Sequence, residues 1–314
     1  MITALAGGVG GAKLAQGLAL ALAPGELTVI VNTADDFDLF GLRICPDLDT
    51  VLYTLAGLAN TTLGWGIKDD TRATLDAIGR LGRDLWFQLG DQDFATHILR
   101  TERLGQGASL TTVIAEFTAA LGVSSVLLPM TNDAVATIVQ TPDGPLDFQT
   151  YFVGRRQQDD VTGLVFRGAS DAAPAPRALE SLATADVIVL CPSNPLVSIG
   201  PILAVPGYRE ALAKAPAPRV AVSPIIGGKA LKGPADRMMA TLGHEVSSVG
   251  VARMYAGLID GLIIDRLDAA LSPAIEALGI RVLVTQSVMG GPDDRRRLAE
   301  ETLAFGRALQ VVRA

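Results

Sequence analysis

The chain contains few of the residues that build zinc sites, disulfide frameworks or membrane spans. Only two of its 314 residues are histidines, His97 and His244, which excludes a histidine-rich zinc site. Its two cysteines, Cys45 and Cys191, are too few for a disulfide framework and indicate a reducing compartment. No apolar run reaches the roughly 18 residues that cross a bilayer, and no basic segment precedes the apolar N-terminus. We therefore expect a soluble cytoplasmic protein with neither a signal peptide nor a membrane span.

Net charge and composition further limit which class of protein this chain can belong to. A net charge of −7 argues against a nucleic-acid-binding surface. An anionic small molecule is compatible with this charge, because backbone N–H groups and a metal ion can supply local positive potential. Hydrophobic residues make up 49% of the chain but aromatic residues only 5%, so small aliphatic side chains must do most of the packing. This is typical of parallel strands covered by helices.

The apolar runs predict a Rossmann-like α/β fold with a doubly wound, mostly parallel sheet. An apolar strand over residues 1–6, a glycine-rich turn over 7–11, a helix over 12–23 and a strand over 27–32 form the opening of such a sheet. The other expected strands cover residues 125–128, 136–140, 146–153, 187–190, 219–222, 261–265 and 282–285.

Helical periodicity predicts a helix-rich insertion at about residues 49–121, within a single α/β domain that spans 1–314. The turn signature at 141–144 predicts a hairpin. The polar segment 154–171 is interpreted as an exposed loop or an extended edge segment. The expected helices cover residues 49–58, 70–81, 93–104, 110–121, 208–214, 235–242 and 293–309.

A cluster of carboxylates follows the second apolar strand. Any one of them could simply cap a loop or a helix, and Asp47 or Asp49 stands where a helix N-cap is expected. As a set they favour a divalent cation, because like charges this close repel unless a cation or proton intervenes. The cluster comprises Asp35, Asp36, Asp38, Asp47 and Asp49.

The glycine-rich turn at residues 7–13 matches neither standard nucleotide fingerprint. The dinucleotide pattern requires glycine where Lys13 stands, and the Walker pattern requires serine or threonine where Leu14 stands. A strand-to-helix turn of this kind still presents N–H groups to an anion, although it could also be a tight turn needed only for packing. The candidate phosphate-binding residues are Gly8, Gly10, Gly11 and Lys13.

Two polar segments directly follow the strands expected at 187–190 and 219–222. The carboxyl ends of parallel strands are where open α/β sheets bind ligands. The first segment offers donors and acceptors suited to a base or ribose, and the second suits a phosphate. The alternative is that these turn residues satisfy only their own backbone. The candidates are Ser193 and Asn194 in the first segment, and Ser223, Gly227, Gly228 and Lys229 in the second.

Several long motifs resemble one family in order and spacing, the 2-phospho-L-lactate transferases of coenzyme F-420 biosynthesis. The resemblance extends from residue 1 to about 265. The motifs cover residues 7–13, 32–36, 45–50, 65–71, 89–93, 95–101, 128–133, 192–202 and 223–236.

The resemblance implies a defined reaction. The acceptor is Fo, the deazaflavin 7,8-didemethyl-8-hydroxy-5-deazariboflavin. The donor is a guanosine diphosphate ester of a three-carbon acid, which makes the transferred group phosphoenolpyruvyl, 2-phospholactyl or 3-phosphoglyceryl. The ribityl hydroxyl of Fo attacks the phosphorus next to the acid, GMP leaves, and Mg²⁺ is required.

The resemblance also implies roles for residues. Asp35 and Asp49 are expected to hold Mg²⁺ or orient the ribityl hydroxyl, with Asp36 and Asp47 as supporting carboxylates. The two glycine loops and Lys229 would hold the pyrophosphate, and Ser193 and Asn194 would face the guanosine. A homodimer is expected from the resemblance and the C-terminal helix. The expected Fo contacts are Asp47, Asp49, Trp65 and Gln88.

Two other functions fit parts of the sequence. A non-catalytic regulator that binds a nucleotide or nucleotide sugar would share the glycine-rich start and the segment 32–36. A dinucleotide-dependent oxidoreductase would use Asp35 or Asp36 to bind ribose, but the third glycine of its fingerprint is missing. Binding of Fo separates the transferase from both.

Overall fold

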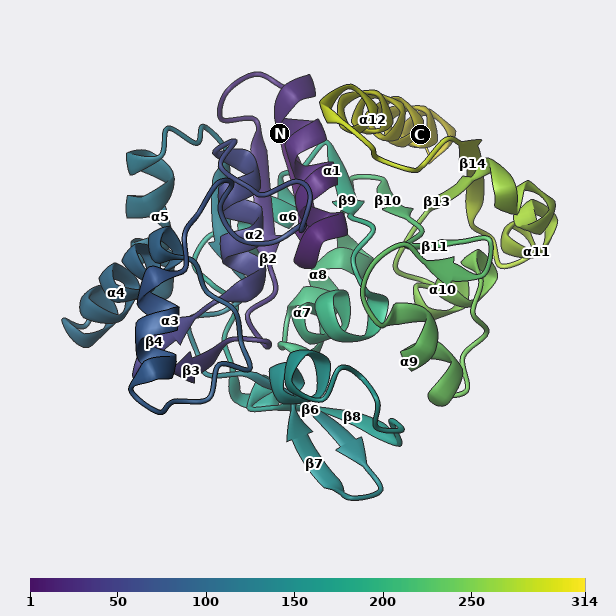
Figure 1. Ribbon diagram of the computed structural model, residues 1–314. Helices are drawn as coiled ribbons and strands as arrows, with labels where there is room; N and C mark the ends of the chain where they lie inside the picture. Colours follow the sequence, from purple (N-terminus) through teal and green to yellow (C-terminus); the bar gives the residue numbers. More distant parts are fainter. Residues whose placement is uncertain (314) are drawn as a thin grey trace.

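A seven-stranded sheet in which every paired strand is parallel forms the centre of the protein (Figure 1). The computed structural model describes the backbone of residues 1–313 and the side chains of residues 1–310. The strand order is β14-β13-β10-β9-β1-β2-β5. The strands are β1 (Ile2–Ala6), β2 (Leu27–Val31), β5 (Val126–Pro129), β9 (Val187–Leu190), β10 (Arg219–Val222), β13 (Gly261–Asp265) and β14 (Arg281–Thr285).

The chain begins in the middle of this sheet and winds in two directions. From β1 it moves outward through β2 to β5, then returns to the other side of β1 with β9 and continues to β14. The strand order therefore reverses between β1 and β9, which is the topological switch point of a doubly wound fold. This confirms the predicted Rossmann-like α/β class. The division of the chain into domains stays a prediction.

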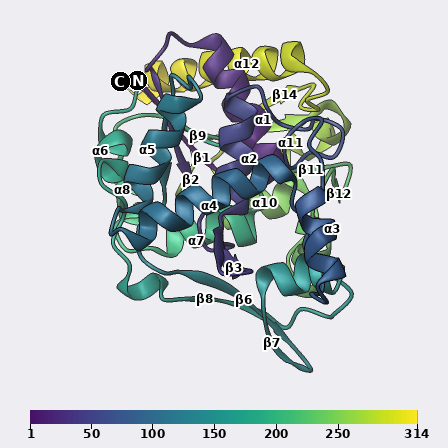
Figure 2. The same cartoon turned by 60° about the vertical axis from the view of Figure 1, so that its left-hand side comes forward.

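Alternating side chains of the strands bury two faces of the sheet. Ala4, Val29 and Val189 point into one core, and Leu5, Ile30 and Ile188 point into the other. Helices cover both faces, as Figures 1 and 2 show from two directions. The first core is shared with α1 (Gly8–Ala21), α2 (Pro46–Leu55), α5 (Leu110–Ala120) and α12 (Pro292–Arg313). The second is shared with α6 (Ala178–Ala183), α7 (Gly200–Ala204), α8 (Tyr208–Lys214), α9 (Ala235–Thr241), α10 (Ser248–Met254) and α11 (Ser272–Glu276).

The predicted helix-rich insertion contains four helices. Two of them, α2 and α5, pack on the sheet, and α5 contacts the edge strand β5. The other two are α3 (Ala73–Arg80) and α4 (Asp91–Gly105), and α4 packs against a short hairpin that the sequence did not predict. The hairpin consists of β3 (Phe37–Leu39) and β4 (Leu42–Ile44). Its strands have three residues each, too short to show an alternating pattern.

A second sheet of three antiparallel strands lies beside the main one, at the bottom of Figure 1. It confirms the predicted hairpin and the reading of 154–171 as containing an extended edge segment. The strand expected over 146–153 was wrong in part, because a π-helical turn, Thr150–Gly154, replaces its second half. The strands are β6 (Ala136–Thr141), β7 (Gly144–Asp147) and β8 (Gly163–Arg167).

Short elements that the sequence did not predict complete the chain. The helices α6, α7, α10 and α11 were missed; they have five to seven residues, less than two full turns, which gives little helical periodicity to detect. None of the helices described within residues 1–313 is both long and apolar enough to cross a bilayer. The remaining elements are the hairpin β11 (Ile225–Ile226) and β12 (Lys229–Ala230), the 3₁₀ turns Ala169–Asp171 and Arg266–Leu271, and the π-helical turn Pro195–Ile199.

Candidate active site

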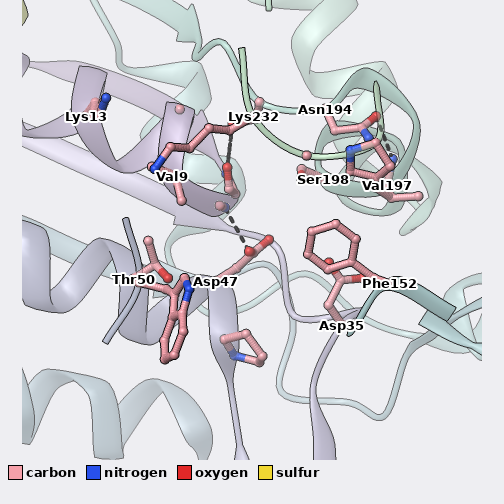
Figure 3. Close-up of a pocket in the computed structure, with 18 of the residues that line it drawn as sticks. Val9, Lys13, Asp35, Asp47, Thr50, Phe152, Asn194, Val197, Ser198 and Lys232 are labelled. Atoms are coloured by element: carbon pink, nitrogen blue, oxygen red, sulfur yellow. Dashed lines mark hydrogen bonds between the residues drawn. The ribbon is translucent and has the colours of Figure 1, made fainter. Parts of the chain in front are cut away.

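A cavity of about 610 Å³ opens at the carboxyl ends of β1 and β9. This is the switch point of the sheet, where open α/β folds place their ligands. In Figure 3 Lys13 and Lys232 lie on one side of this cavity and Asp35 and Phe152 on the other. Of the residues predicted from sequence, the cavity brings together Gly8, Gly10, Lys13, Asp35, Asp47, Asp49, Trp65, Gln88, Ser193, Asn194 and Ser223.

The N-terminus of α1 forms one wall of the cavity. The helix begins at Gly8, so the segment expected as a turn over 7–11 is mostly its first turn. The first N–H groups of a helix have no partner within it and carry the positive end of its dipole. The N–H of Gly8 donates to Asp47 Oδ1 at 2.8 Å, and Val9 and Gly10 also line the cavity. This wall can therefore bind an anion.

Close packing explains why glycines occupy this turn. A Cβ at position 10 would lie 2.3 Å from the carbonyl oxygen of Pro192, and one at position 11 would lie 2.5 Å from Ser193 Oγ. Gly11 is buried against Ser193 and does not itself line the cavity, as far as the described residues show. Packing thus explains these glycines, and anion binding by the N–H groups of this turn stays a prediction.

Asp35 and Asp47 form a buried acidic pair. Asp35 follows β2, and Asp47 lies in the first turn of α2; they are 5% and 8% exposed. Asn32 Nδ2 donates to Asp47 Oδ2 at 3.0 Å, whereas Asp35 Oδ1 has no hydrogen-bond partner among the described residues. Burial raises the pKa of Asp35 well above its usual value, and the charge of Asp47 raises this pKa further. Burial also raises the pKa of Asp47 to about 6.

Asp49, only two residues further along α2, has a different environment. It forms a bidentate ion pair with the fully buried Arg100, whose Nη1 donates to Asp49 Oδ2 at 3.1 Å. Nη1 also lies 3.2 Å from His97 Nδ1. Because a guanidinium can only donate, Nδ1 accepts and the proton of His97 is on Nε2. We call Asp49, His97 and Arg100 the arginine cluster; burial lowers the pKa of His97 to about 4.

Two lysines face the cavity from the opposite side. Lys13 Nζ donates to the carbonyl of Met289 at 3.1 Å, and Lys232 Nζ donates to the carbonyl of Leu63, also at 3.1 Å. Burial lowers the pKa of Lys13, and the positive charges of Arg295 and Lys232 lower it further. The two ammonium groups therefore repel each other, and an anion between them would relieve that repulsion.

Three predicted polar residues line the cavity but use side-chain atoms to hold the backbone. Ser193 Oγ accepts from the N–H of Gly7 at 3.0 Å and donates to the Gly7 carbonyl at 2.9 Å. Asn194 Oδ1 accepts from the N–H of Leu196 at 2.9 Å. Ser223 Oγ donates to the carbonyl of Ile225 at 3.0 Å. Their alternative interpretation as turn residues is supported. The role of Ser193 and Asn194 toward guanosine and that of Ser223 toward a phosphate stay predictions.

Gly227, Gly228 and Lys229 are not among the described residues that line the cavity. They form the tight turn of the β11–β12 hairpin, where φ is +58° at Gly227 and +75° at Gly228. The N–H of Gly227 is bound by both oxygens of Asp268 at 3.1 Å. The turn thus has a structural explanation, and the lysine of this segment that reaches the cavity is Lys232 instead.

Aromatic and apolar side chains complete the wall near the arginine cluster. Trp65 is 44% exposed at the cavity, and Phe87 stands beside Gln88 there. Gln88 Nε2 donates to the carbonyl of Leu85 at 2.8 Å, and its buried Oε1 has no partner within the described chain. Trp86 packs instead on Phe87, with ring centroids 5.5 Å apart. The wall offers flat apolar surface with a few polar groups.

The predicted magnesium ion can be tested against these carboxylates. Within residues 1–310, no group of three His, Cys, Asp or Glu side chains is placed to hold a metal. Magnesium in phosphate-transferring sites is often held by one or two carboxylates, with phosphate and water completing its shell. The acidic pair fits this requirement, because Asp35 Oδ1 is unpartnered and both carboxylates have raised pKa values. Asp49 fits less well, since Arg100 engages both its oxygens.

A smaller cavity of about 330 Å³ lies behind Asp35 and shares Phe148 and Gln149 with the main one. Asp36 lines it with two buried oxygens that accept no hydrogen bond from the described residues. Burial raises the pKa of Asp36 to about 7, although Arg43 Nη2 lies 3.8 Å away and opposes the shift. Asp36 therefore does not face the main cavity, and Asp38 lines only the smaller one, with an exposed side chain.

Sequence reasoning missed or undervalued four residues at the site. Lys232 is in the motif 223–236, but it stands four residues after Gly228 and so was not grouped with that glycine-rich turn as a candidate phosphate-binding residue. Asn32 holds Asp47, and Arg100 neutralises Asp49 from 51 residues away. His97 shares one face of α4 with Arg100, and that spacing was the only available signal.

Comparisons with known proteins identify the family of this chain. A family profile described as 2-phospho-L-lactate transferase CofD matches residues 2–277. A Streptomyces griseus protein named phosphoenolpyruvate transferase is 45% identical over 316 residues, covering 99% of each chain. A Methanosarcina mazei protein named 2-phospho-L-lactate transferase is 41% identical, covering 94% of this chain and 96% of its own.

A solved structure shows the same fold at low sequence similarity. It is a member of the UPF0052 family from Bacillus halodurans, with a TM-score of 0.64 and 19% identity. The match covers 96% of this chain and 99% of that chain. At this identity the likeness concerns the architecture alone.

Proposed function

Because this chain belongs to the 2-phospho-L-lactate transferase CofD family, we propose that it transfers a phospho-three-carbon-acid group from a guanosine diphosphate ester to the ribityl hydroxyl of Fo. The reaction releases GMP and forms a phosphodiester. Membership of the family confirms the resemblance stated for the sequence. The donor, the acceptor and the metal are our proposal.

One feature above all supports a diphosphate donor: cationic and acidic groups face each other across a single cavity. The N-terminus of α1, Lys13 and Lys232 offer positive potential to the two phosphates. Asp35 and Asp47 would hold Mg²⁺ against the same phosphates. When bound, the ion would neutralise the charge of the transferred phosphoryl group.

The guanosine would occupy the side of the cavity lined by Asn194 and Phe152, both labelled in Figure 3. Phe152 offers a ring for the base, and Ser193 and Asn194 supply polar edges. The deazaflavin would occupy the opposite wall, against Trp65, Phe87 and Gln88. This arrangement brings the acceptor next to the arginine cluster.

The protein's contribution to the chemistry is chiefly positioning. Phosphoryl transfer passes through a loose transition state in which alignment and charge neutralisation dominate. Asp49, held in place by Arg100, would orient the ribityl hydroxyl and accept its hydrogen bond. As the new P–O bond forms, the bond to GMP breaks and the hydroxyl proton passes to Asp49.

The three-carbon acid is proposed to be enolpyruvate. The supporting observation is that the Streptomyces griseus relative, 45% identical over nearly the whole chain, is named phosphoenolpyruvate transferase. A Streptomyces coelicolor relative with the same name is 42% identical over 98% of this chain. The 41% identity to the Methanosarcina mazei 2-phospho-L-lactate transferase keeps lactate as the second candidate.

The direct test supplies the protein with Fo, Mg²⁺ and each guanylylated acid in turn. GMP release is followed by chromatography, and the Fo product is identified by mass spectrometry. We expect fastest turnover with the enolpyruvyl donor and none after chelation of Mg²⁺. Nucleotide binding without GMP release, from any donor, would favour the non-catalytic regulator instead.

We also propose that the protein acts as a homodimer in the cytoplasm. Light scattering of the purified protein tests the oligomeric state, and cell fractionation tests the location. A monomer at micromolar concentration would contradict the first proposal.

A further inference from the structure

Lys232 connects two segments that meet at the cavity although they are far apart in sequence. It lies between β12 and α9, on the side where the donor phosphates are proposed to bind. Its Nζ donates to the carbonyl of Leu63, 169 residues away in the chain. Leu63 and Trp65 belong to the loop 60–66, on the side proposed for the acceptor. Lys232 thus lines the cavity and bonds the loop 60–66.

The loop 60–66 is internally bonded, so Leu63 and Trp65 are held in one arrangement. Asn60 Oδ1 accepts from the N–H groups of Thr62 at 3.1 Å and Leu63 at 3.0 Å. The N–H of Asn60 donates to the carbonyl of Gly66 at 2.9 Å, which closes the loop at its base. The carbonyl of Leu63 and the backbone of Trp65 therefore belong to one bonded loop.

Lys232 has bonding capacity left for an anion. Its ammonium group has three hydrogens, and Leu63 takes one of them. In Figure 3 its side chain extends toward Val9 at the N-terminus of α1, with Lys13 nearby. The repulsion between Lys13 and Lys232 makes an anion between them favourable. The group that would bind this anion is the same group that bonds the loop 60–66.

We infer that Lys232 couples the two substrates: a bound donor phosphate fixes its ammonium group, and the ammonium group fixes the loop that carries the Trp65 wall of the acceptor site. This inference rests on the proposed function. A nucleoside diphosphate then tightens the binding of the deazaflavin, and by thermodynamic reciprocity the deazaflavin tightens the binding of the nucleotide by the same factor. Lys232 is a positioning residue for the acceptor, because it acts on the bound deazaflavin through Leu63.

The experiment measures the dissociation constant of Fo by calorimetry, with and without saturating GDP and Mg²⁺. In the wild-type protein we expect GDP to lower this constant at least fivefold. In Lys232→Met we expect GDP to change this constant by less than twofold. GDP must be saturating for each variant, because Lys232→Met also weakens GDP binding.

A matched control lies three residues away. Lys229 is exposed on the turn of the β11–β12 hairpin and is not among the cavity-lining residues described. Lys229→Met loses the same charge, and we expect it to keep the full coupling factor. Lys232→Arg retains donors for both partners and should restore part of the coupling. Because Lys232 is exposed, thermal melting should show that its variants remain folded.

The outcomes separate this inference from the proposed function. Wild-type protein that binds GDP and Fo independently of each other would overturn the inference and leave the transferase proposal standing. Lys232→Met that keeps the wild-type coupling factor would overturn it as well. Wild-type protein that does not bind Fo at all would contradict both this inference and the proposed transferase function.

Discussion

Two aspartates in the first turn of α2 lie two residues apart and have opposite surroundings. Asp47 accepts hydrogen bonds from neutral donors and shares its site with Asp35, so the acidic pair has no cation beside it in the described chain. Asp49 is neutralised by the buried Arg100. The comparison shows that the acidic pair depends on a ligand for charge balance, whereas the arginine cluster is balanced within the protein itself.

Breaking the arginine cluster should have the largest effect. Arg100→Met leaves Asp49 buried without its partner, and losing one member of a buried ion pair costs about 3–5 kcal/mol of folding free energy. Urea denaturation measures this loss. Arg103→Met is the control on the same helix: its partner Glu116 is exposed, so we expect less than about 1 kcal/mol. Equal losses of folding free energy in Arg100→Met and Arg103→Met would contradict the distinction between the buried and the exposed ion pair.

Neutralising one member of the acidic pair should greatly reduce activity without harming the fold. Asp35→Asn removes a carboxylate proposed to bind Mg²⁺, and we expect turnover to fall about 10²- to 10³-fold, the usual effect of losing one transition-state contact. The free energy of unfolding should stay constant or rise, because a buried like-charge pair is relieved. Steady-state kinetics and urea denaturation measure the two quantities. Asp38→Asn, at an exposed carboxylate, should change neither.

Adding a methyl group to the first turn of α1 should have a smaller effect. In Gly10→Ala the new Cβ would meet the Pro192 carbonyl, and forcing the helix away costs about 1–3 kcal/mol of stability. Donor affinity should fall with it, because the N–H groups of this turn move. Gly105→Ala, where the new atom meets nothing within 4 Å, should leave both quantities unchanged or slightly improved. Calorimetry with GDP measures the affinity, and thermal melting measures the stability.

The effect expected from Asp36 depends on pH, because the nearby Arg43 compensates its buried charge only in part. Its pKa in the folded protein, about 7, lies above the unfolded value of 3.8, so its ionisation opposes folding. Its contribution to stability is present below about pH 4 and is lost as the pH rises to about 7. Asp36→Asn should therefore gain stability relative to wild type across that window, by at most about 1.4 kcal/mol per pH unit. A difference in stability between Asp36→Asn and wild type that does not change with pH would contradict the raised pKa of Asp36.

The parallel strands and the glycine turn of α1 could be predicted because their signals are local. A short run rich in leucine, isoleucine and valine, as in β2, identifies a strand buried on both faces. The helix at 46–55 was also predicted, but its start was placed three residues late, so Asp49 was interpreted as a possible cap. The cap position belongs to Cys45.

The partners of the charged residues could not be predicted, since they come from distant parts of the chain. Nothing near Asp49 indicates that Arg100 will neutralise it, and nothing near Gly227 indicates that Asp268 will bind its N–H group. Two glycine-rich segments that looked equivalent therefore differ: one opens a helix at the cavity, and the other closes a hairpin away from it.

The contact between the first and last helices bears on the order in which the protein assembles during synthesis. Gly17 of α1 approaches the backbone of Arg295 so closely that a Cβ would lie 2.1 Å from its carbonyl oxygen. Lys13 likewise donates to Met289, just before α12. Residues 8–21 leave the ribosome nearly 270 residues before these partners, and contacts this distant form late in folding. The nascent chain should therefore acquire nucleotide affinity only in its final stage of translation.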